Sequence, residues 1–227
     1  MSAPPSIRIF QKGPERSAQR NEGWRQARGE YVFFVDADMR VPEATLREIQ
    51  SKIAGEGSVV PDAFFVREVR VGKGWWTRVR NFERSFYDAT CIDALRVIRR
   101  DLLERVGGYD ERMHACEDWD LDRRLLPLTR NVTLTDGHLL HDERRLTFAK
   151  HLRKKVYYSG NFSFYLSKWG RDAITRKQFG FGYRFFGVFF ENGKWKRVLA
   201  RPHYMAAIGF ERVCVGMVYL AVRLRIL

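Results

Sequence analysis

The sequence has few cysteines, and no two of them lie close together. The three cysteines, Cys91, Cys116 and Cys214, are odd in number and widely separated. Without a Cys-x-x-Cys pair, neither a disulfide framework nor a zinc site is expected, and the pattern fits a reducing compartment. There is also no internal repeat or low-complexity linker, so the 227 residues predict one domain with an appendage.

No apolar run is long enough for a clean transmembrane helix. The last run, 213–222, has ten residues, whereas a membrane span takes about 20. Extending the run back to Met205 brings in Glu211 and Arg212. Residues 1–5 also lack the basic-then-apolar pattern of a signal peptide. We therefore expect a cytoplasmic protein whose C-terminal helix lies at the interface of a membrane rather than across it.

Acidic residues are scarce in the last part of the chain. Residues 1–143 hold 23 Lys/Arg and 24 Asp/Glu, whereas residues 144–227 hold 18 Lys/Arg and 3 Asp/Glu. The second segment is also rich in aromatic residues, a combination typical of binding to nucleic acid or to an anionic membrane. No nucleic-acid recognition motif occurs, so we expect a membrane surface and no nucleic acid. The alternative is a helical subdomain that packs its aromatic side chains on the rest of the protein.

Short apolar runs alternate with amphipathic segments through residues 1–143. The predicted strands are 7–10, 31–35, 63–66, 95–98 and 132–140. The predicted helices are 15–28, 42–53, 76–87, 101–106 and 117–126, followed by a long helix over 146–169 that is interrupted at Gly160. This alternation predicts an α/β domain over 1–143, followed by a basic, aromatic helical region over 144–227.

Two carboxylates, Asp36 and Asp38, follow the apolar run 31–35. Residues two apart on an extended chain point the same way, so both could face one object. Two like charges so close together are costly without a cation, and hard divalent cations prefer carboxylate oxygens. The pair therefore indicates a metal or nucleotide site at the end of a buried strand. The alternative is a solvated turn that happens to contain two acidic residues.

A second acidic cluster, Glu117 to Asp122, follows the turn-rich segment 107–110. A carboxylate held there in a cleft could act as a general base. The alternative is ordinary acidic charge at the start of a helix, which the helix dipole favours. His141, at the end of the last predicted strand, is a candidate ligand for manganese or magnesium together with carboxylates. A hydrogen-bonded polar histidine is the alternative.

Taken in order, these motifs resemble the family-2 glycosyltransferases, which have the nucleotide-diphospho-sugar transferase fold. The similarity extends from about Ser17 to His141. It is carried by Ala18-Gln-Arg-Asn-Glu-Gly23, Ala27-Arg-Gly-Glu-Tyr31, Phe34-Val-Asp-Ala-Asp38, Val97-Ile-Arg-Arg-Asp101, Gly107-Gly-Tyr-Asp-Glu111, Glu117-Asp-Trp-Asp-Leu121 and His141. The resemblance implies a GT-A-like, Rossmann-related α/β fold with a mixed sheet flanked by helices.

The resemblance also implies a donor site with a divalent cation, Mn²⁺ or Mg²⁺. Asp38 and His141 correspond to ligands of a metal ion that bridges the donor diphosphate. Asp36 corresponds to a neighbouring residue that contacts the metal, the ribose or the sugar. Arg20 and Asn21 match a donor-binding motif. The donor is then a nucleotide-diphospho-sugar.

For catalysis, the resemblance implies that Asp118 is the base, with Glu117 as its neighbour. Inverting glycosyl transfer needs a carboxylate to take the proton of the acceptor hydroxyl and a cation to stabilise the departing diphosphate. Arg153 and Lys154 could add positive charge near that diphosphate. Alternatively, they belong to a solvated basic helix face or contact lipid headgroups.

The sequence departs from the family pattern in two places. Only residues 1–12 precede the region of similarity, so the base-binding βα unit at the N-terminus is expected to be missing. The Gln-x-x-Arg-Trp motif of processive synthases is absent, which favours a non-processive enzyme. We expect metal-dependent, inverting sugar transfer to a lipid-linked or polysaccharide acceptor in the cell envelope. The alternatives are a non-catalytic remnant and, less favoured because Arg40 breaks its motif, a phosphatase-type hydrolase.

Overall fold

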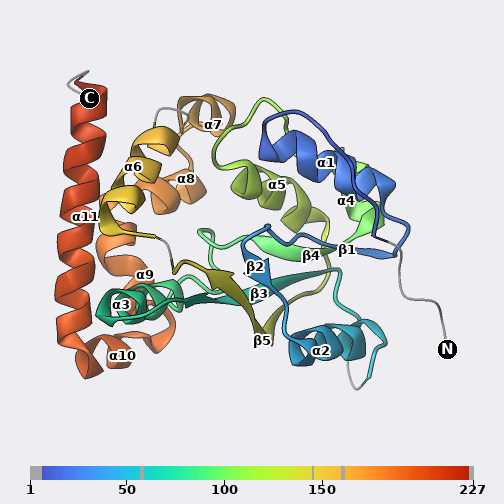
Figure 1. The fold of residues 1–227 in the computed structure, drawn as a ribbon, viewed down its shortest axis with the longest axis horizontal. Helices are drawn as coiled ribbons and strands as arrows, with labels where there is room; N and C mark the ends of the chain where they lie inside the picture. Colours follow the sequence, from blue (N-terminus) through green and yellow to red (C-terminus); the bar gives the residue numbers. More distant parts are fainter. Residues whose placement is uncertain (1–6, 57–58, 145, 160–161, 225–227) are drawn as a thin grey trace.

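The computed structural model describes residues 7–56, 59–144, 146–159 and 162–224. They form a mixed α/β fold with a five-stranded sheet in the order β1-β4-β3-β5-β2 (Figure 1). The strands are β1 (Tyr31–Phe33), β2 (Met39–Arg40), β3 (Ala63–Val71), β4 (Leu95–Arg99) and β5 (Val132–Asp142). Strands β3 and β5 are parallel, and the other neighbours are antiparallel. The predicted fold class is therefore confirmed.

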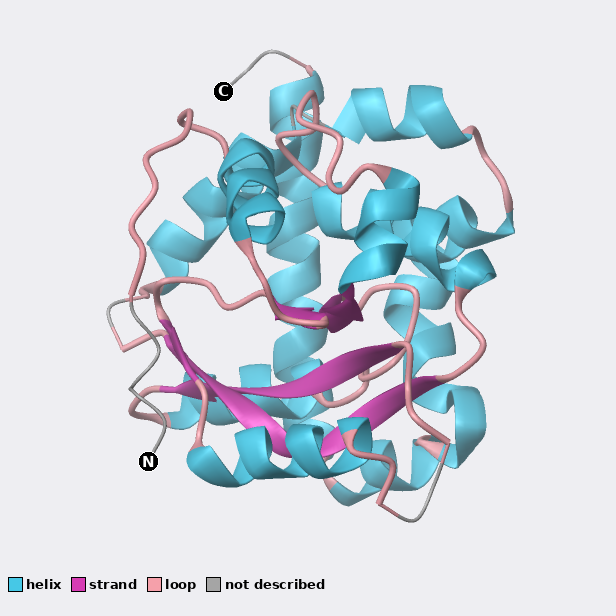
Figure 2. Cartoon of the chain, turned by 90° about the vertical axis from the view of Figure 1, so that its right-hand side faces the viewer, coloured by secondary structure: helices cyan, strands magenta, loops and turns pink. Residues whose placement is uncertain are grey.

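The helices before β5 cover both faces of this sheet. They are α1 (Arg16–Gln26), α2 (Glu43–Ile53), α3 (Trp75–Arg84), α4 (Arg100–Val106) and α5 (Glu117–Leu125). Alternate residues of β3 pack in opposite directions, as expected for a strand that is buried on both faces. Phe65 packs in a core with α1, α4 and α5, whereas Phe64 packs in a second core with α2. Figure 2 shows the sheet between these helical layers.

The helices after β5 gather at the α3 end of the sheet (Figure 1). They are α6 (Phe148–Ser159), α7 (Phe162–Trp169), α8 (Ala173–Phe179), α9 (Val188–Phe190), α10 (Trp195–Ala200) and α11 (Pro202–Arg223). A third hydrophobic core joins Val79 and Phe86 in and after α3 to Val188, Phe189, Tyr204 and Ile208. None of the helices in the described ranges combines the length and apolar character needed to cross a bilayer.

Three sequence-based predictions of local structure were wrong or incomplete. Residues 7–10 form no strand, and Ile7 and Ile9 are exposed because no neighbouring strand pairs with them. Strand β1 ends at Phe33, before the turn at 37–38. Strand β3 continues to Val71, beyond its predicted end at residue 66. The predicted interruption at Gly160 lies outside the described residues.

Candidate active site

Arg20 connects the two acidic clusters that the sequence analysis singled out. Its guanidinium donates from Nη2 to Asp36 Oδ1 at 2.7 Å and from Nη1 to Asp118 Oδ1 at 2.6 Å. The side chain is only 10% exposed. Burial opposes the charge of Arg20, but the carboxylates of Asp118 and Asp36 outweigh it and raise the pKa of Arg20 above its ordinary value. The structure therefore brings Arg20, Asp36 and Asp118 into one charged cluster.

Asp36 is held by two arginines rather than directed toward Asp38. Arg96 of β4 donates to Asp36 Oδ2 at 3.3 Å, opposite the bond from Arg20. Burial acts against its charge, yet these two arginines hold the pKa of Asp36 below its ordinary value. The expectation that both carboxylates face one object was wrong, because β1 ends at Phe33 and the chain turns before Asp38. Asp36 thus lies in the arginine cluster, and Asp38 lies elsewhere.

Asp38 lies beside His141 because strands β2 and β5 pair there. Met39 is opposite His141 in the ladder, and Asp142 N–H donates to the carbonyl of Asp38 at 2.8 Å. His141 Nε2 is 3.1 Å from Asp38 Oδ2, and Asp38 is 57% exposed. On its other side, His141 Nδ1 is 2.9 Å from Glu68 Oε1 of β3. The hydrogen bond with Glu68 raises the pKa of His141, and burial opposes that shift.

The contact between Asp38 and His141 fits a divalent cation held by two protein side chains. An imidazolium can donate from both ring nitrogens, to Glu68 and to Asp38. A neutral imidazole that donates from Nδ1 to Glu68 leaves the lone pair of Nε2 available to a cation shared with Asp38. Adjacent ligands of an octahedral ion bound at about 2.1 Å are about 3.0 Å apart. Across the described residues, no three His, Cys, Asp or Glu side chains are grouped to hold a metal. The remaining ligands would have to be water or substrate.

Asp118 and Glu117, at the start of α5, differ in their environment. Asp118 is 25% exposed, and its Oδ1 accepts from Arg20. Glu117 is only 4% exposed and pairs with Arg16 at 2.8 Å. Burial, together with the adjacent charge of Asp118, raises the pKa of Glu117. Asp118 is therefore the more accessible carboxylate for a substrate hydroxyl.

The N-terminal part of α5 is tied to the loop before β4. Trp119 Nε1 donates to the carbonyl of Ile92 at 3.2 Å, and the buried carboxyl of Asp122 accepts from Leu95 N–H at 3.1 Å. Cys116, directly before the helix, has a φ of 60°, a left-handed conformation that is unusual for a residue other than glycine. These contacts fix the position of Asp118 relative to Arg20 and Asp36.

Asn21 lies in the protein interior. Its Nδ2 donates to the Tyr109 carbonyl and to Glu111, and its Oδ1 accepts from Trp24 Nε1 and Tyr109 N–H, at distances of 2.8–2.9 Å. The residue is 1% exposed. With both polar atoms occupied inside the protein, its position favours support of the segment around Tyr109 over contact with a donor.

Replacing Asn21 with alanine should destabilise the fold. The Tyr109 peptide would lose its partners, and leaving buried polar groups unsatisfied costs about 1–3 kcal/mol per group. We expect a loss of about 2–4 kcal/mol in the free energy of unfolding, measured by urea denaturation. Gln26→Ala, which removes only exposed bonds to Glu22 and from Arg8, is the control and should change stability by at most about 0.5 kcal/mol. Unchanged stability with lost donor binding would instead make Asn21 a donor contact.

Arg153 and Lys154 are exposed on α6 and form no ion pair within the described part of the chain. They do not join the cluster around Arg20. In contrast, sequence reasoning missed Arg96 and Glu68, which connect Asp36 to His141. Arg96 Nη2 is 3.7 Å from Glu68 Oε2. Both residues could have been noticed in the sequence, because each is a charged residue within an apolar strand segment. These segments are Leu95-Arg-Val-Ile98 and Phe64-Phe-Val-Arg-Glu-Val69.

The sequence and the fold of this chain have counterparts in known proteins. Two family models match the chain, "Glycosyl transferase family 2" over residues 4–107 and "Glycosyltransferase like family 2" over residues 89–188. Among curated proteins, the pre-mycofactocin glycosyltransferase of Mycobacterium tuberculosis is 24% identical over 166 residues, which are 66% of this chain and 34% of that protein. The chain therefore spans about a third of the length of the curated relatives it matches.

One solved structure of similar fold gives the same classification. The mannosyltransferase PcManGT from Pyrobaculum calidifontis, in complex with GDP-Man and Mn²⁺, is 17% identical, with a TM-score of 0.52 over 94% of this chain and 66% of that one. S. aureus TarS is 15% identical, with a TM-score of 0.45 over 92% of this chain and 71% of that one. The architecture is the GT-A fold of glycosyltransferases. The chain belongs to the family-2 glycosyltransferases.

Proposed function

We propose that the protein transfers a sugar from a nucleotide-diphospho-sugar to an acceptor hydroxyl with inversion, using Mn²⁺ or Mg²⁺. The observation that carries this proposal is the convergence of Asp118, Arg20 and Asp36 with Asp38 and His141 through Arg96 and Glu68. Support comes from the accessible carboxylate of Asp118 and the Asp38–His141 pair lying in one connected cluster. The solved mannosyltransferase of similar fold holds both a sugar nucleotide and Mn²⁺, which supports the same requirements here.

In this proposal, Asp118 takes the proton of the acceptor hydroxyl. Arg20 bonds only Oδ1 of Asp118, and among the described residues Oδ2 has no hydrogen-bond donor, so it is the oxygen available to the acceptor. Arg20 and Asp36 lie on the donor side of the base. A bound divalent cation would neutralise the charge that develops on the departing diphosphate. Asp38 and His141 would hold it.

Donor binding can be tested with a panel of nucleotide sugars in the presence of Mn²⁺. A ligand that binds only the folded state raises stability by about 2.7 kcal/mol at a hundredfold excess over its Kd, so one nucleotide should raise the thermal midpoint clearly. Release of the nucleoside diphosphate then measures turnover. No shift with any donor would refute the proposal, and binding without turnover would identify a non-catalytic remnant. A phosphatase-type hydrolase is disfavoured because both oxygens of Asp36 are held by arginines.

We further propose that the protein works on the cytoplasmic face of a membrane, where its acceptor is lipid-linked or part of an envelope polysaccharide. The support comes from α11. Glu211 and Arg212 of this helix face inward, since Glu211 pairs with His151 of α6 at 2.5 Å and Arg212 pairs with Glu83 of α3 at 2.7 Å. Four of its apolar side chains point outward with exposures of 54–64%, namely Phe210, Val213, Met217 and Leu220.

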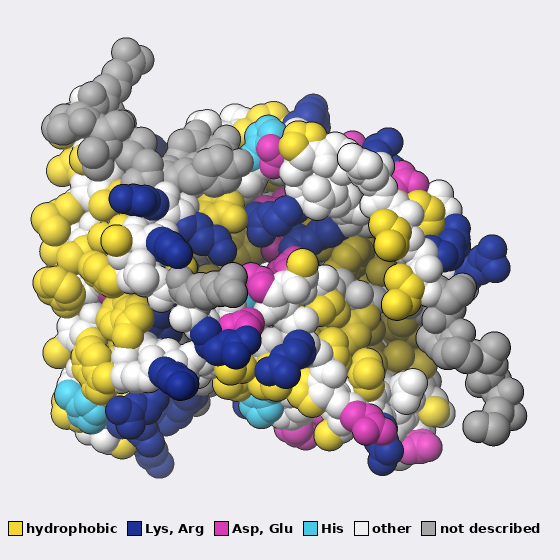
Figure 3. All heavy atoms as spheres, viewed as in Figure 1, with side chains coloured by type: hydrophobic (Ala, Val, Ile, Leu, Met, Phe, Trp, Pro, Cys, Tyr) yellow, Lys and Arg dark blue, Asp and Glu magenta, His cyan; other side chains and the backbone are white. Residues whose placement is uncertain are grey.

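This outer face of α11 suits an anionic lipid surface. In Figure 3 hydrophobic side chains occupy the edge of the molecule where Figure 1 places α11, with Lys and Arg side chains nearby. Lys196, Arg197 and Arg201 are exposed on and after α10, and Arg153 and Lys154 are exposed on α6, which packs against α11. Basic residues beside an apolar helix face favour headgroup contact, whereas pairing two copies would bring two basic regions together.

A charge on the outer face of α11 should release the protein from membranes. We expect Met217→Asp to lower binding to phosphatidylglycerol-containing vesicles at least about tenfold, because burying an apolar side chain contributes about 1.5–3 kcal/mol. Vesicle flotation of the full chain measures the effect. Leu46→Asp, on α2 and 39% exposed, is the matched control and should bind as before. Equal binding of Met217→Asp, or a dimer in light scattering without lipid, would contradict the proposal.

A further inference from the structure

Glu68 is the one carboxylate of the cluster that touches His141 from inside the protein. It lies on β3, its side chain is 8% exposed, and its Oε1 is 2.9 Å from His141 Nδ1. In the parallel ladder Arg70 is opposite His141, so Glu68, two residues earlier, projects from the same face of the sheet. The pairing of β3 with β5 therefore sets the distance between Glu68 and the imidazole.

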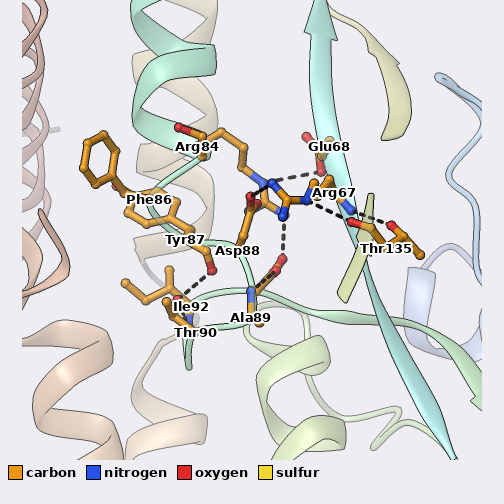
Figure 4. Close-up of polar contacts among 12 residues, drawn as sticks. Arg67, Glu68, Arg84, Phe86, Tyr87, Asp88, Ala89, Thr90, Ile92 and Thr135 are labelled. Atoms are coloured by element: carbon orange, nitrogen blue, oxygen red, sulfur yellow. Dashed lines mark hydrogen bonds and ion pairs between the residues drawn. The ribbon is translucent and has the colours of Figure 1, made fainter. Parts of the chain in front are cut away.

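Glu68 is itself held in place by cations on its other side. Its Oε2 lies 3.8 Å from Arg84 Nε and 3.7 Å from Arg96 Nη2. Figure 4 shows Arg84 between Glu68 and Asp88. Arg84 also donates to Asp93 Oδ1 at 2.5 Å, and Asp93 accepts from Ala89 N–H at 2.8 Å. Arg70 Nη2 is a third cation beside this carboxylate, 3.9 Å from Oε1. Three arginines around one carboxylate favour an ionised hydrogen-bond acceptor.

We propose that Glu68 is a positioning residue that orients His141 so that Nε2 faces Asp38 and the cation. An ionised acceptor at Nδ1 fixes the ring orientation and places the ring proton on Nδ1, which leaves the lone pair of Nε2 for a metal. Partners of this kind behind a metal-binding histidine change metal affinity about 10- to 100-fold when removed. The inference rests on the proposed cation site at Asp38 and His141, and it adds the residue that prepares this site before the metal arrives.

The first test needs no substitution. In the metal-free protein, at a pH where the imidazole is neutral, nitrogen NMR shifts of His141 should place the proton on Nδ1. A proton on Nε2 would overturn the inference whatever the activity of the enzyme, because Nε2 could not then accept a metal without rearrangement. Spectra of His141→Gln assign the signals.

The second test measures Mn²⁺ binding directly, by electron paramagnetic resonance of the free ion. Glu68→Gln keeps the size of the side chain, and we expect it to weaken Mn²⁺ binding about 10- to 100-fold. Asp88→Asn is the matched control, since Asp88 also pairs with Arg84 at 3.5 Å but is not among the partners of His141. It should bind Mn²⁺ as the unsubstituted chain does. Unchanged affinity in Glu68→Gln, with the fold intact by circular dichroism, would overturn the inference.

Two further variants separate this inference from the proposed function. Asp38→Ala and His141→Gln remove the proposed ligands themselves, so both should lose Mn²⁺ binding. If neither does, the cation site is not at these residues and the proposed function fails. If both lose it while Glu68→Gln binds normally, the site is correct and only the role of Glu68 fails.

Discussion

The variant Asp118→Asn is expected to lose transfer activity while it keeps its donor. Asparagine has the size of aspartate and its Oδ1 can still accept from Arg20, but it cannot take a proton from the acceptor. Loss of a general base lowers kcat by about 10²- to 10⁴-fold. Release of nucleoside diphosphate measures turnover, and a thermal shift with donor and Mn²⁺ measures binding. The kcat should fall and the donor affinity should stay the same.

Two other variants make this result specific. Asp101→Asn changes a carboxylate of α4 that is 51% exposed and pairs with Arg99 at the end of β4, and it should keep full turnover. Glu117→Gln tests the neighbouring carboxylate, which is buried beside Arg16. If Glu117→Gln abolished turnover and Asp118→Asn did not, the base would be Glu117. Normal turnover in both variants would contradict the assignment of the base to this helix.

The second large effect is expected from Asp38→Ala. Removal of one of two proposed protein ligands should weaken Mn²⁺ binding by at least about 100-fold, since even partners behind a ligand change it by 10- to 100-fold. Transfer should be lost with it. Asp38 is 57% exposed and its side chain contacts His141, so the stability of the metal-free protein should change by no more than about 0.5 kcal/mol. Metal titration and thermal unfolding of the same samples separate the two quantities.

Asp36→Asn is the informative comparison for that experiment. Both oxygens of Asp36 are bonded by arginines. In Asp36→Asn the amide nitrogen would face one of these arginines and the shared negative charge would be lost, so the variant should retain Mn²⁺ affinity and lose donor affinity. Loss of Mn²⁺ binding in Asp36→Asn, with normal binding in Asp38→Ala, would exchange the roles of the two carboxylates.

Most helices and strands could be predicted because the residues that define them lie close together in the sequence. Apolar runs and glycine stops correctly indicated β4, α2 and α5 to within a few residues. Residues 7–10 have the composition of a strand, but a strand also requires a partner, and the composition does not say whether one is present. Strand β3 continues to Val71 because its charged residues pair inside the protein, as Arg70 does with Glu143 at 3.2 Å. A pattern that assigns charge to the surface ends the strand at Val66.

The candidate site was predictable only in part for the same reason. Motif order indicated Asp38, Asp118 and His141, which the fold brings into one connected cluster. Glu68 and Arg96 link these residues, and nothing in the sequence around either one predicts which side chain it contacts. Their pairing depends on the strand order β1-β4-β3-β5-β2, which no single segment encodes. The turn that separates Asp36 from Asp38 likewise depends on the short pairing of β2 with β5.

The way α11 is attached has a practical consequence for anyone who shortens this protein. Tyr204 and Ile208 of α11 complete the same core as Val79 and Phe86, and Arg212 neutralises the buried Glu83. Cutting the chain before residue 173 would uncover that core and leave Glu83 without its counter-charge, so a truncated protein that fails to pellet with membranes could simply have misfolded. The C-terminal helices therefore cannot be deleted without disturbing the fold. Point substitutions on the outward side of α11 test membrane binding without this effect on folding.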